Sequence, residues 1–253
     1  MPLGWSSDPL ATPQDHSRFE EVPASMSKIA QQIEAVEWDF ADVPPATGVH
    51  ALHSYPAKFI PNLPATLIEL LSEPGDLVID PFAGGGTTGV EATRLGRRFF
   101  GSDANAFAVL LSNVKLRGIT PQIRAALKRH LDRVSASDLR VAGHNAWKPD
   151  IPNLEKWYDP KVFDDLAGLR AELLKLRIED ARDIAMLALA SAAARLSFQE
   201  SETRYVSQPR AVADGAALST YTAEVVRMLT ALPRRQSGEV GVVRLGDARE
   251  ADV

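Results

Sequence analysis

Short apolar runs separated by longer helical patterns predict an α/β arrangement. Runs rich in β-branched or aromatic residues are typical of strands, and here they predict strands at residues 77–79, 97–103 and 242–245. Apolar residues at helical spacing predict helices at residues 27–38, 64–71 and 106–117. Strands and helices alternate in the first half of the chain, which favours a doubly wound, Rossmann-like parallel sheet whose first strand is buried.

From residue 119 to residue 239 the pattern changes to a series of helices. They are predicted at residues 121–134, 161–176, 181–196 and 220–232. The third of them is rich in alanine and apolar nearly all round, so we expect it to be the buried centre of a helical subdomain. His130 lies on the apolar stripe of the first of them and is expected to be a packed residue, not a ligand.

This pattern divides the chain into four parts. We predict a lead-in and helix at 1–48, an α/β core at 49–118, a helical insertion between the second and third strands at 119–239, and the third strand with an acidic motif at 240–253. Residues 1–25 are polar and contain prolines, so the lead-in is expected to be disordered or loosely packed.

The composition excludes several kinds of chemistry. The 253 residues contain no cysteine, which excludes disulfides and thiolate sites, and the histidines lack ligand spacing, so no metal is expected. The formal net charge is −5, so nothing global indicates nucleic acid, and the basic residues of the helical region are interpreted as solvated faces. No signal-peptide pattern is visible and no uncharged stretch is long enough to span a bilayer, so a cytoplasmic location is expected.

A glycine-rich turn after the first strand carries the strongest functional signal. Pro81 ends the strand, and Gly84, Gly85 and Gly86 let the backbone turn sharply and approach a ligand. The turn lacks the Lys-Ser/Thr pair of a Walker A loop, and the Asp80 carboxylate disfavours a pyrophosphate. S-adenosylmethionine carries a sulfonium, an ammonium and no phosphate, so it suits the turn better than a dinucleotide. A tight turn without a ligand is the alternative.

Asp103 stands at the end of the predicted second strand. A carboxylate in this place can accept hydrogen bonds from both hydroxyls of an adenosine ribose. Sites for S-adenosylmethionine and for NAD share this feature, so Asp103 supports a nucleoside without choosing between them. The alternative role for Asp103 is to cap the following helix.

Two motifs resemble those of a known enzyme family. The run DPFAGGGTT at residues 80–88 resembles the cofactor-binding motif of DNA amino-methyltransferases, which modify cytosine N4 or adenine N6. The run HSYPAKFIP at residues 53–61 is similar to the preceding element of that family, which closes over the methionine end of the cofactor. With a short match at residues 246–248, the resemblance covers under half of the chain, and the two motifs together are more specific than either alone.

The resemblance implies a methyltransferase that binds S-adenosylmethionine and a DNA duplex from which the target base is flipped. It implies a cover made of Tyr55, Pro56 and Lys58. It places Asp80, Phe82, Ala83, Gly84, Gly86, Thr87 and Thr88 around the methionine and sulfonium, Asp103 and Asn105 beside the ribose and adenine, and Asp247 at the adenine amine.

The catalytic motif of the family, Ser/Asp/Asn-Pro-Pro followed by Tyr, Phe or Trp, does not occur in the sequence. The single Pro-Pro pair, Pro44-Pro45, has neither the polar nor the aromatic neighbour. In relatives with this motif order, the motif follows the Gly-Asp-Ala element on a fourth strand, which pairs with the first. We therefore expect an incomplete sheet with an open edge at residues 77–79, in a partial chain that is inactive alone.

Two other functions stay open. RNA N-methyltransferases share a similar Asp-Pro-Phe-x-Gly-x-Gly-Thr element, although no separate RNA-binding module is visible. The other alternative is a non-catalytic remnant that binds S-adenosylmethionine and complements a second chain carrying the catalytic motif.

Overall fold

The computed structural model describes residues 24–41, 47–135, 138–201, 204–235 and 241–250. The chain divides into two compact units, residues 1–40 and residues 41–253. The expected lead-in lies outside the described residues up to residue 23, and so does the Pro44-Pro45 pair.

The first unit contains α1 (Ala24–Glu34), which begins and ends earlier than the predicted helix at residues 27–38. The carbonyl of Ile33 explains the early end, because it accepts hydrogen bonds from the Val36 amide at 3.3 Å and from Trp38 Nε1 at 3.0 Å. The Ile33 carbonyl is thus bound by an amide three residues later and by a side chain, in place of the amide four residues later that would continue the α-helix.

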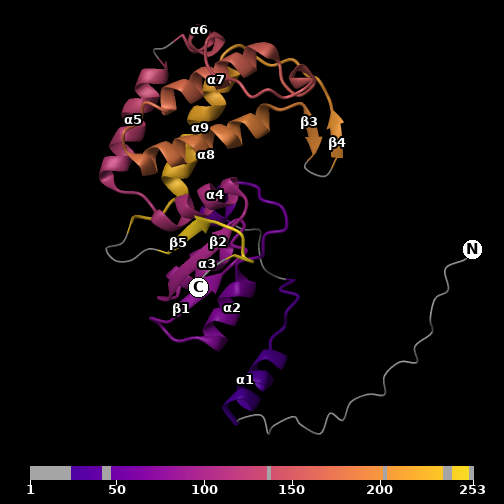
Figure 1. The fold of residues 1–253 in the computed structure, drawn as a ribbon, viewed down its shortest axis with the longest axis vertical. Helices are drawn as coiled ribbons and strands as arrows, with labels where there is room; N and C mark the ends of the chain where they lie inside the picture. The colour runs from indigo at the N-terminus through magenta and orange to yellow at the C-terminus, as the bar shows by residue number, and fades with distance from the viewer. Residues whose placement is uncertain (1–23, 42–46, 136–137, 202–203, 236–240, 251–253) are drawn as a thin grey trace, which may run out of the picture. The chain divides into compact units, whose positions relative to one another are not determined.

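In the described part of the second unit, a parallel sheet has three strands in the order β1-β2-β5 (Figure 1). They are β1 (Leu77–Asp80), β2 (Arg98–Asp103) and β5 (Val242–Leu245), each within one residue of its predicted place. Asp80 lies beside Gly101 and Asp103 beside Leu245, so the carboxyl ends of the strands meet at one edge. Parallel sheets place their ligands at this edge.

Three helices cover the face of the sheet that carries Phe99 and Val243. They are α2 (Asn62–Leu71), α3 (Thr87–Arg94) and α4 (Ala106–Arg117), and they lie beside the strands in Figure 1. Each helix contributes one side chain to a small core with Phe99 and Val243, namely Ile68 from α2, Ala92 from α3 and Leu116 from α4. The bounds of α4 agree with the predicted helix at both ends.

The other face of the sheet is open at β1. Leu77 is 49% exposed and Ile79 is 42% exposed. Side chains alternate along a strand, so these two point away from Val78, which packs against the small core. The prediction of a buried first strand is therefore wrong, and the second helical layer of a doubly wound sheet is not seen in the described residues. The predicted open edge is confirmed, because β1 pairs only with β2 among the described strands.

Between α4 and β5 the described chain is mainly helical (Figure 1). The predicted helices correspond to α5 (Pro121–Ser135), α7 (Pro160–Leu173), α8 (Glu179–Leu196) and α9 (Ala216–Ala231). As expected, α8 is the buried centre, where the side chains of Ala185, Leu187 and Ala188 are all 0% exposed.

Several short elements of this region were not predicted. They are α6 (Leu139–His144), a 3-10 helix η2 (Leu154–Lys156), and an antiparallel pair of β3 (Gln199–Ser201) and β4 (Arg204–Ser207). Close packing of α6 on α7 depends on two glycines. A Cβ on Gly143 would lie 1.8 Å from the carbonyl oxygen of Asp164, and one on Gly168 would lie 2.1 Å from that of Leu139.

His130 is part of this helical core. It is 0% exposed, and its Nε2 lies 2.7 Å from the Tyr221 hydroxyl on α9, so the prediction of a packed histidine is confirmed. Burial is the main reason why its pKa falls to about 4, and the nearby Arg133 guanidinium lowers it further.

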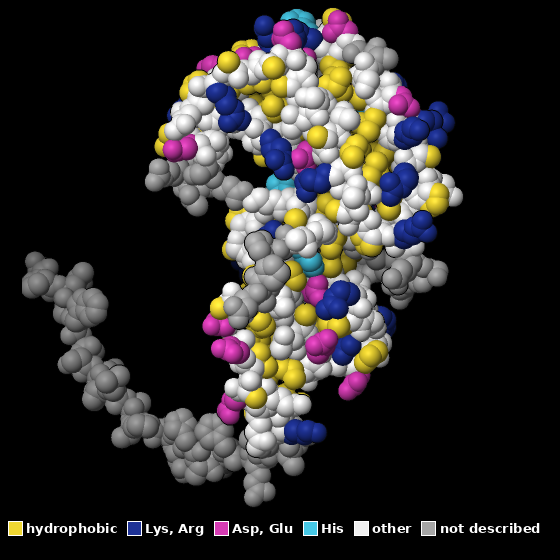
Figure 2. Space-filling model, turned by 180° about the vertical axis from the view of Figure 1, so that it is seen from behind, with side chains coloured by type: hydrophobic (Ala, Val, Ile, Leu, Met, Phe, Trp, Pro, Cys, Tyr) yellow, Lys and Arg dark blue, Asp and Glu magenta, His cyan; other side chains and the backbone are white. Residues whose placement is uncertain are grey.

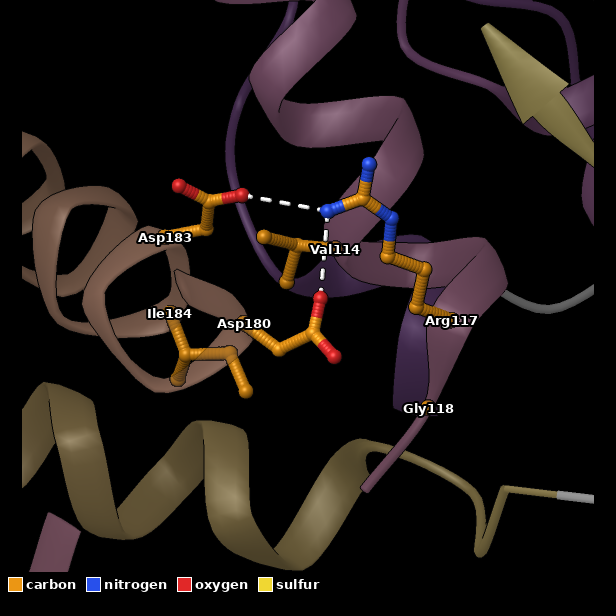
Figure 3. A pocket seen from close by; sticks show the side chains of 6 residues that line it. All are labelled: Val114, Arg117, Gly118, Asp180, Asp183 and Ile184. Carbon is orange, nitrogen blue, oxygen red and sulfur yellow. Dashed lines mark hydrogen bonds and ion pairs between the residues drawn. The ribbon is translucent and has the colours of Figure 1, made fainter. Parts of the chain in front are cut away.

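Ion pairs join α4 to α8 (Figure 3). The Arg117 guanidinium donates from Nη1 to Asp180 at 3.1 Å and to Asp183 at 3.3 Å. Arg235 also donates to Asp180, at 2.6 Å, and to the Arg117 carbonyl at 2.7 Å. The small pocket between Val114 and Ile184 at this junction has no room for a water molecule, so it is a packing joint rather than a ligand site.

The surface view agrees with the interpretation of solvated basic faces. On the face shown in Figure 2, Lys and Arg side chains are spread over the helical part, with Asp and Glu side chains among them. No helix among the described residues is both long and apolar enough to cross a membrane. The same residues contain no cluster of three side chains able to hold a metal ion.

Candidate functional site

The glycine turn begins where β1 ends. Asp80 Oδ1 accepts a hydrogen bond from the Phe82 amide at 3.0 Å, which turns the chain out of the strand. The Gly86 amide then donates to the Ala83 carbonyl at 2.8 Å, and α3 follows. Gly84 and Gly86 have φ angles of +49° and +75°, a left-handed conformation that favours glycine.

The Ser112 side chain also requires glycine at position 86, and the Tyr55 side chain lies at contact distance from the other two glycines. A Cβ on Gly86 would lie 2.7 Å from Ser112 Oγ on α4. On the other side of the turn, a Cβ on Gly84 or on Gly85 would lie 3.4 Å from the Tyr55 side chain. The turn therefore fits between α4 and Tyr55, which belongs to the predicted cover.

Asp103 binds the turn directly. Its Oδ2 accepts from the Gly84 amide at 2.8 Å, and its Oδ1 accepts from the Asn105 amide at 2.8 Å. Asn105 caps α4, because its Oδ1 accepts from the Phe107 amide at 2.9 Å. The alternative role of Asp103 as the helix cap is therefore wrong.

The predicted cover follows a 3-10 helix, η1 (Gly48–Ala51), and is attached to two other helices. The Lys58 ammonium donates to the His50 carbonyl at 3.1 Å, and His50 Nε2 lies 2.8 Å from the Glu91 carboxylate on α3. On the other side, the Arg227 guanidinium of α9 donates to the Ala51 and Leu52 carbonyls at 2.9 and 2.6 Å.

Glu91 is 4% exposed and is held by two partners. Burial raises the pKa of its carboxyl, but the hydrogen bonds from His50 and Arg94 outweigh this, and the pKa lies below its usual value. Glu91 therefore carries a negative charge that fixes the position of His50 against α3.

A groove of about 60 Å³ lies between the cover and the turn. Eight residues of the predicted cofactor site line it, namely Tyr55, Lys58, Asp80, Phe82, Ala83, Gly84, Thr87 and Thr88. Ala57, Phe59 and Gly85 complete its wall.

Five other residues of the predicted site are not on this wall: Pro56, Gly86, Asp103, Asn105 and Asp247. Gly86 is buried beneath the turn. Asp247 is paired with Arg249 at 2.5 Å, and its neighbour Gly246 donates to the Asp103 carbonyl at 3.1 Å.

Sequence reasoning missed the side chains that support the turn from behind. Ser112 and Lys115 of α4 donate to the carbonyls of Gly84 and Gly85. A signal was available, because both are polar residues one turn apart on the same face of the predicted helix.

Comparisons with known proteins give a consistent assignment. A family model described as DNA methylase matches residues 10–113. The Type II methyltransferase M.MjaII of Methanocaldococcus jannaschii is 36% identical over 116 residues, which are 46% of this chain and 22% of that protein. M.MvaI of Kocuria varians is 29% identical over 125 residues, covering 46% and 27% of the two chains.

M.PvuII of Proteus hauseri, also a Type II methyltransferase, is 37% identical over 76 residues, which are 27% of this chain and 23% of that protein. No solved structure matches. The match thus spans about a quarter of the length of these curated relatives. The matched residues 10–113 include both the cover and the glycine turn, so this part of the chain is similar to DNA methylases.

Proposed function

We propose that the groove binds S-adenosylmethionine and that the chain is the cofactor-binding part of a methyltransferase acting on exocyclic amines of DNA, cytosine N4 or adenine N6. One observation carries this proposal. The glycine turn and the cover, which are the two motifs shared with the family, line the same groove, with Asp80 at its edge.

The residues of the groove fit the amino-acid end of this cofactor. Gly84 and Gly85 leave open space that a Cβ would narrow against Tyr55. The Asp80 carboxylate attracts an ammonium or sulfonium and disfavours a pyrophosphate. Ligand pockets typically hold about 300 Å³ or more, so a groove of about 60 Å³ accommodates one end of the molecule and not the whole.

Each residue has a role in the bound state. S-adenosylmethionine supplies the methyl group, carried on its sulfonium. Asp80 balances the positive charge, and Tyr55 covers the glycine turn from the side opposite α4. Asp103 holds the Gly84 amide and extends the site toward the ribose, while Asp247 serves the adenine amine.

Methyl transfer requires a second set of residues. The target amine is a poor nucleophile in a base taken out of the duplex, and the polar and aromatic residues that the family uses to bind it are absent from the sequence. We therefore propose that this chain alone binds the cofactor and does not methylate DNA. Methylation of duplex DNA by the purified chain would contradict this.

Isothermal titration calorimetry with S-adenosylmethionine tests the cofactor assignment. The chain should bind it, and Asp80→Asn should weaken binding about tenfold through loss of a charged contact. Asp76→Asn is the matched control, because Asp76 immediately precedes β1 at the opposite end of the strand and is exposed. Binding of NAD without binding of S-adenosylmethionine would overturn the assignment.

The open edge of β1 favours a second candidate, a cofactor-binding chain that complements another chain carrying the catalytic motif. Leu77 and Ile79 offer apolar side chains beside an edge with free pairing positions. A strand added there would end close to Asp80 and the groove. Methylation activity that arises only when a chain with the catalytic motif is mixed in would support this candidate, and lack of association would contradict it.

A further inference from the structure

Lys115 of α4 is an unusual buried cation. It is 1% exposed, and its ammonium donates to the Gly85 carbonyl at 2.5 Å. Among the described residues, no carboxylate forms an ion pair with it. Lysines are almost never fully buried without a charged partner, because desolvation of the ammonium is costly. Burial lowers the pKa of Lys115 to about 8, with a smaller contribution from the Lys58 ammonium.

Ser112 lies one helical turn earlier on the same face of α4. Its hydroxyl donates to the Gly84 carbonyl at 2.8 Å, so α4 binds the carbonyls of two successive glycines. The peptide bonds are trans, and the amide of a trans peptide points opposite to its carbonyl. The Gly85 amide therefore points away from α4, toward the side of the turn where Tyr55 and the groove lie.

Asn113, between these two residues, has a different partner. Its side-chain amide binds the backbone of Val243 in β5, at 2.8 Å to the carbonyl and 3.0 Å to the amide. The bonds of Ser112 and Lys115 are thus specific to the glycine turn and are not a general feature of α4 packing.

We propose that Lys115 and Ser112 are positioning residues, which hold the glycine turn so that the Gly85 amide faces the amino-acid end of the ligand. This rests on the proposed function, because it takes the groove to be the site of S-adenosylmethionine. The charged donor on the Gly85 carbonyl polarises the peptide group between Gly85 and Gly86, whose amide donates to the Ala83 carbonyl and closes the turn.

Binding of two ligands separates positioning from simple stability. 5′-Methylthioadenosine keeps the adenosine of S-adenosylmethionine and lacks the amino-acid end. Measured by calorimetry, Lys115→Met should weaken binding of S-adenosylmethionine about tenfold and change that of methylthioadenosine less than about twofold. Ser112→Ala should weaken binding of S-adenosylmethionine about threefold, with the same selectivity between the two ligands. This variant replaces Lys115→Met in the test if Lys115→Met does not fold.

Arg97→Met is the matched control. Arg97 is also a buried cation that donates to backbone carbonyls, of Ser72 at 2.5 Å and Leu95 at 2.8 Å, but it does not contact the glycine turn. Its loss should lower the melting temperature and leave both affinities unchanged. The positioning role would be overturned if Lys115→Met and Ser112→Ala weakened the binding of both ligands equally, or of neither. Binding of S-adenosylmethionine by the wild-type chain would still uphold the cofactor assignment in that case. Absence of wild-type binding would overturn both.

The pH dependence is a second readout. The ammonium is the stronger donor, so the affinity advantage of wild type over Lys115→Met should shrink as the pH rises from 7 to 9.5, through the pKa of about 8. Titration of the ligand's own amine cancels, because it affects both proteins alike. An advantage that is constant over this range would show that the charge of Lys115 has no role.

Discussion

The helical region and the sheet differ in how completely each buries its apolar side chains. The core around α8 contains Leu169, Leu173 and Met228 at 0% exposed, whereas β1 leaves Leu77 and Ile79 nearly half exposed. Among the residues that the structure describes, six are buried in the small sheet core, including Phe99 and Val243. The helical region shares its large core with Leu111 and Val114 of α4, while the sheet has one open face and one open edge next to the groove. Leu77, Ile79 and Phe82 thus leave apolar surface exposed where a ligand or a further strand can be added.

The largest difference is expected from core truncation. Leu173→Ala should lower the free energy of unfolding by about 2–5 kcal/mol, because it leaves a cavity in the helical core. Ile79→Ala should cost less than about 1 kcal/mol, because its side chain is already 42% exposed. Urea denaturation measures both. Equal losses would show that the open face of β1 is covered in solution.

The next largest effect is an acid-dependent loss of stability that comes from His130, in the helical region. The pKa of His130 lies at about 4 in the folded chain, below the usual value of 6.5, so the unfolded chain binds more protons between these values. The free energy of unfolding should therefore fall by about 2–3 kcal/mol as the pH drops through this window.

Denaturation at pH 7, 5.5 and 4.5 checks this expectation. His130→Phe should flatten the dependence, whereas His144→Gln, at an exposed position, should leave it unchanged. Parallel pH curves for wild type and His130→Phe would contradict a buried neutral histidine.

The smallest effect on stability is expected at the edge strand, where association changes instead. Leu77→Lys should alter the free energy of unfolding by less than about 0.5 kcal/mol and should reduce self-association, because a charged edge resists strand pairing. Sedimentation velocity measures the association. Val226→Lys is the matched control on α9, at 50% exposed, and should have no effect on it. If both substitutions changed self-association to a similar extent, the edge of β1 would be no more prone to association than the surface of α9.

Most of the fold could be predicted because its elements have strong local patterns. The strands at 98–103 and 242–245 and the helix at 106–117 follow directly from apolar spacing. Apolar spacing cannot show whether a neighbour covers a strand, which is why β1 was expected to be buried. The short α6 and the β3–β4 pair lack a sustained period, and their formation depends on packing against α7 and neighbouring turns.

The site was predictable to the extent that it is contiguous in sequence. The turn and cover residues line the groove because two local motifs bring them there. The bonds of Asp103 to Gly84, of Ser112 to Gly84 and of Lys115 to Gly85 join residues distant in sequence. Such pairs depend on the approach of β2 and α4 to the turn, which no local pattern contains.

The pairing of Asn113 with Val243 has a kinetic consequence. The two residues are separated by 130 positions, and the chain between them forms the helical region. Closing a loop of this length has a large entropic cost unless the intervening chain has already become compact. Helices rich in local contacts form fast, so β5 is expected to dock late and to complete the sheet beside Asp103 after α5–α9 have collapsed. The strand ends at Asp103 and Leu245 would then be among the last parts of the sheet to mature.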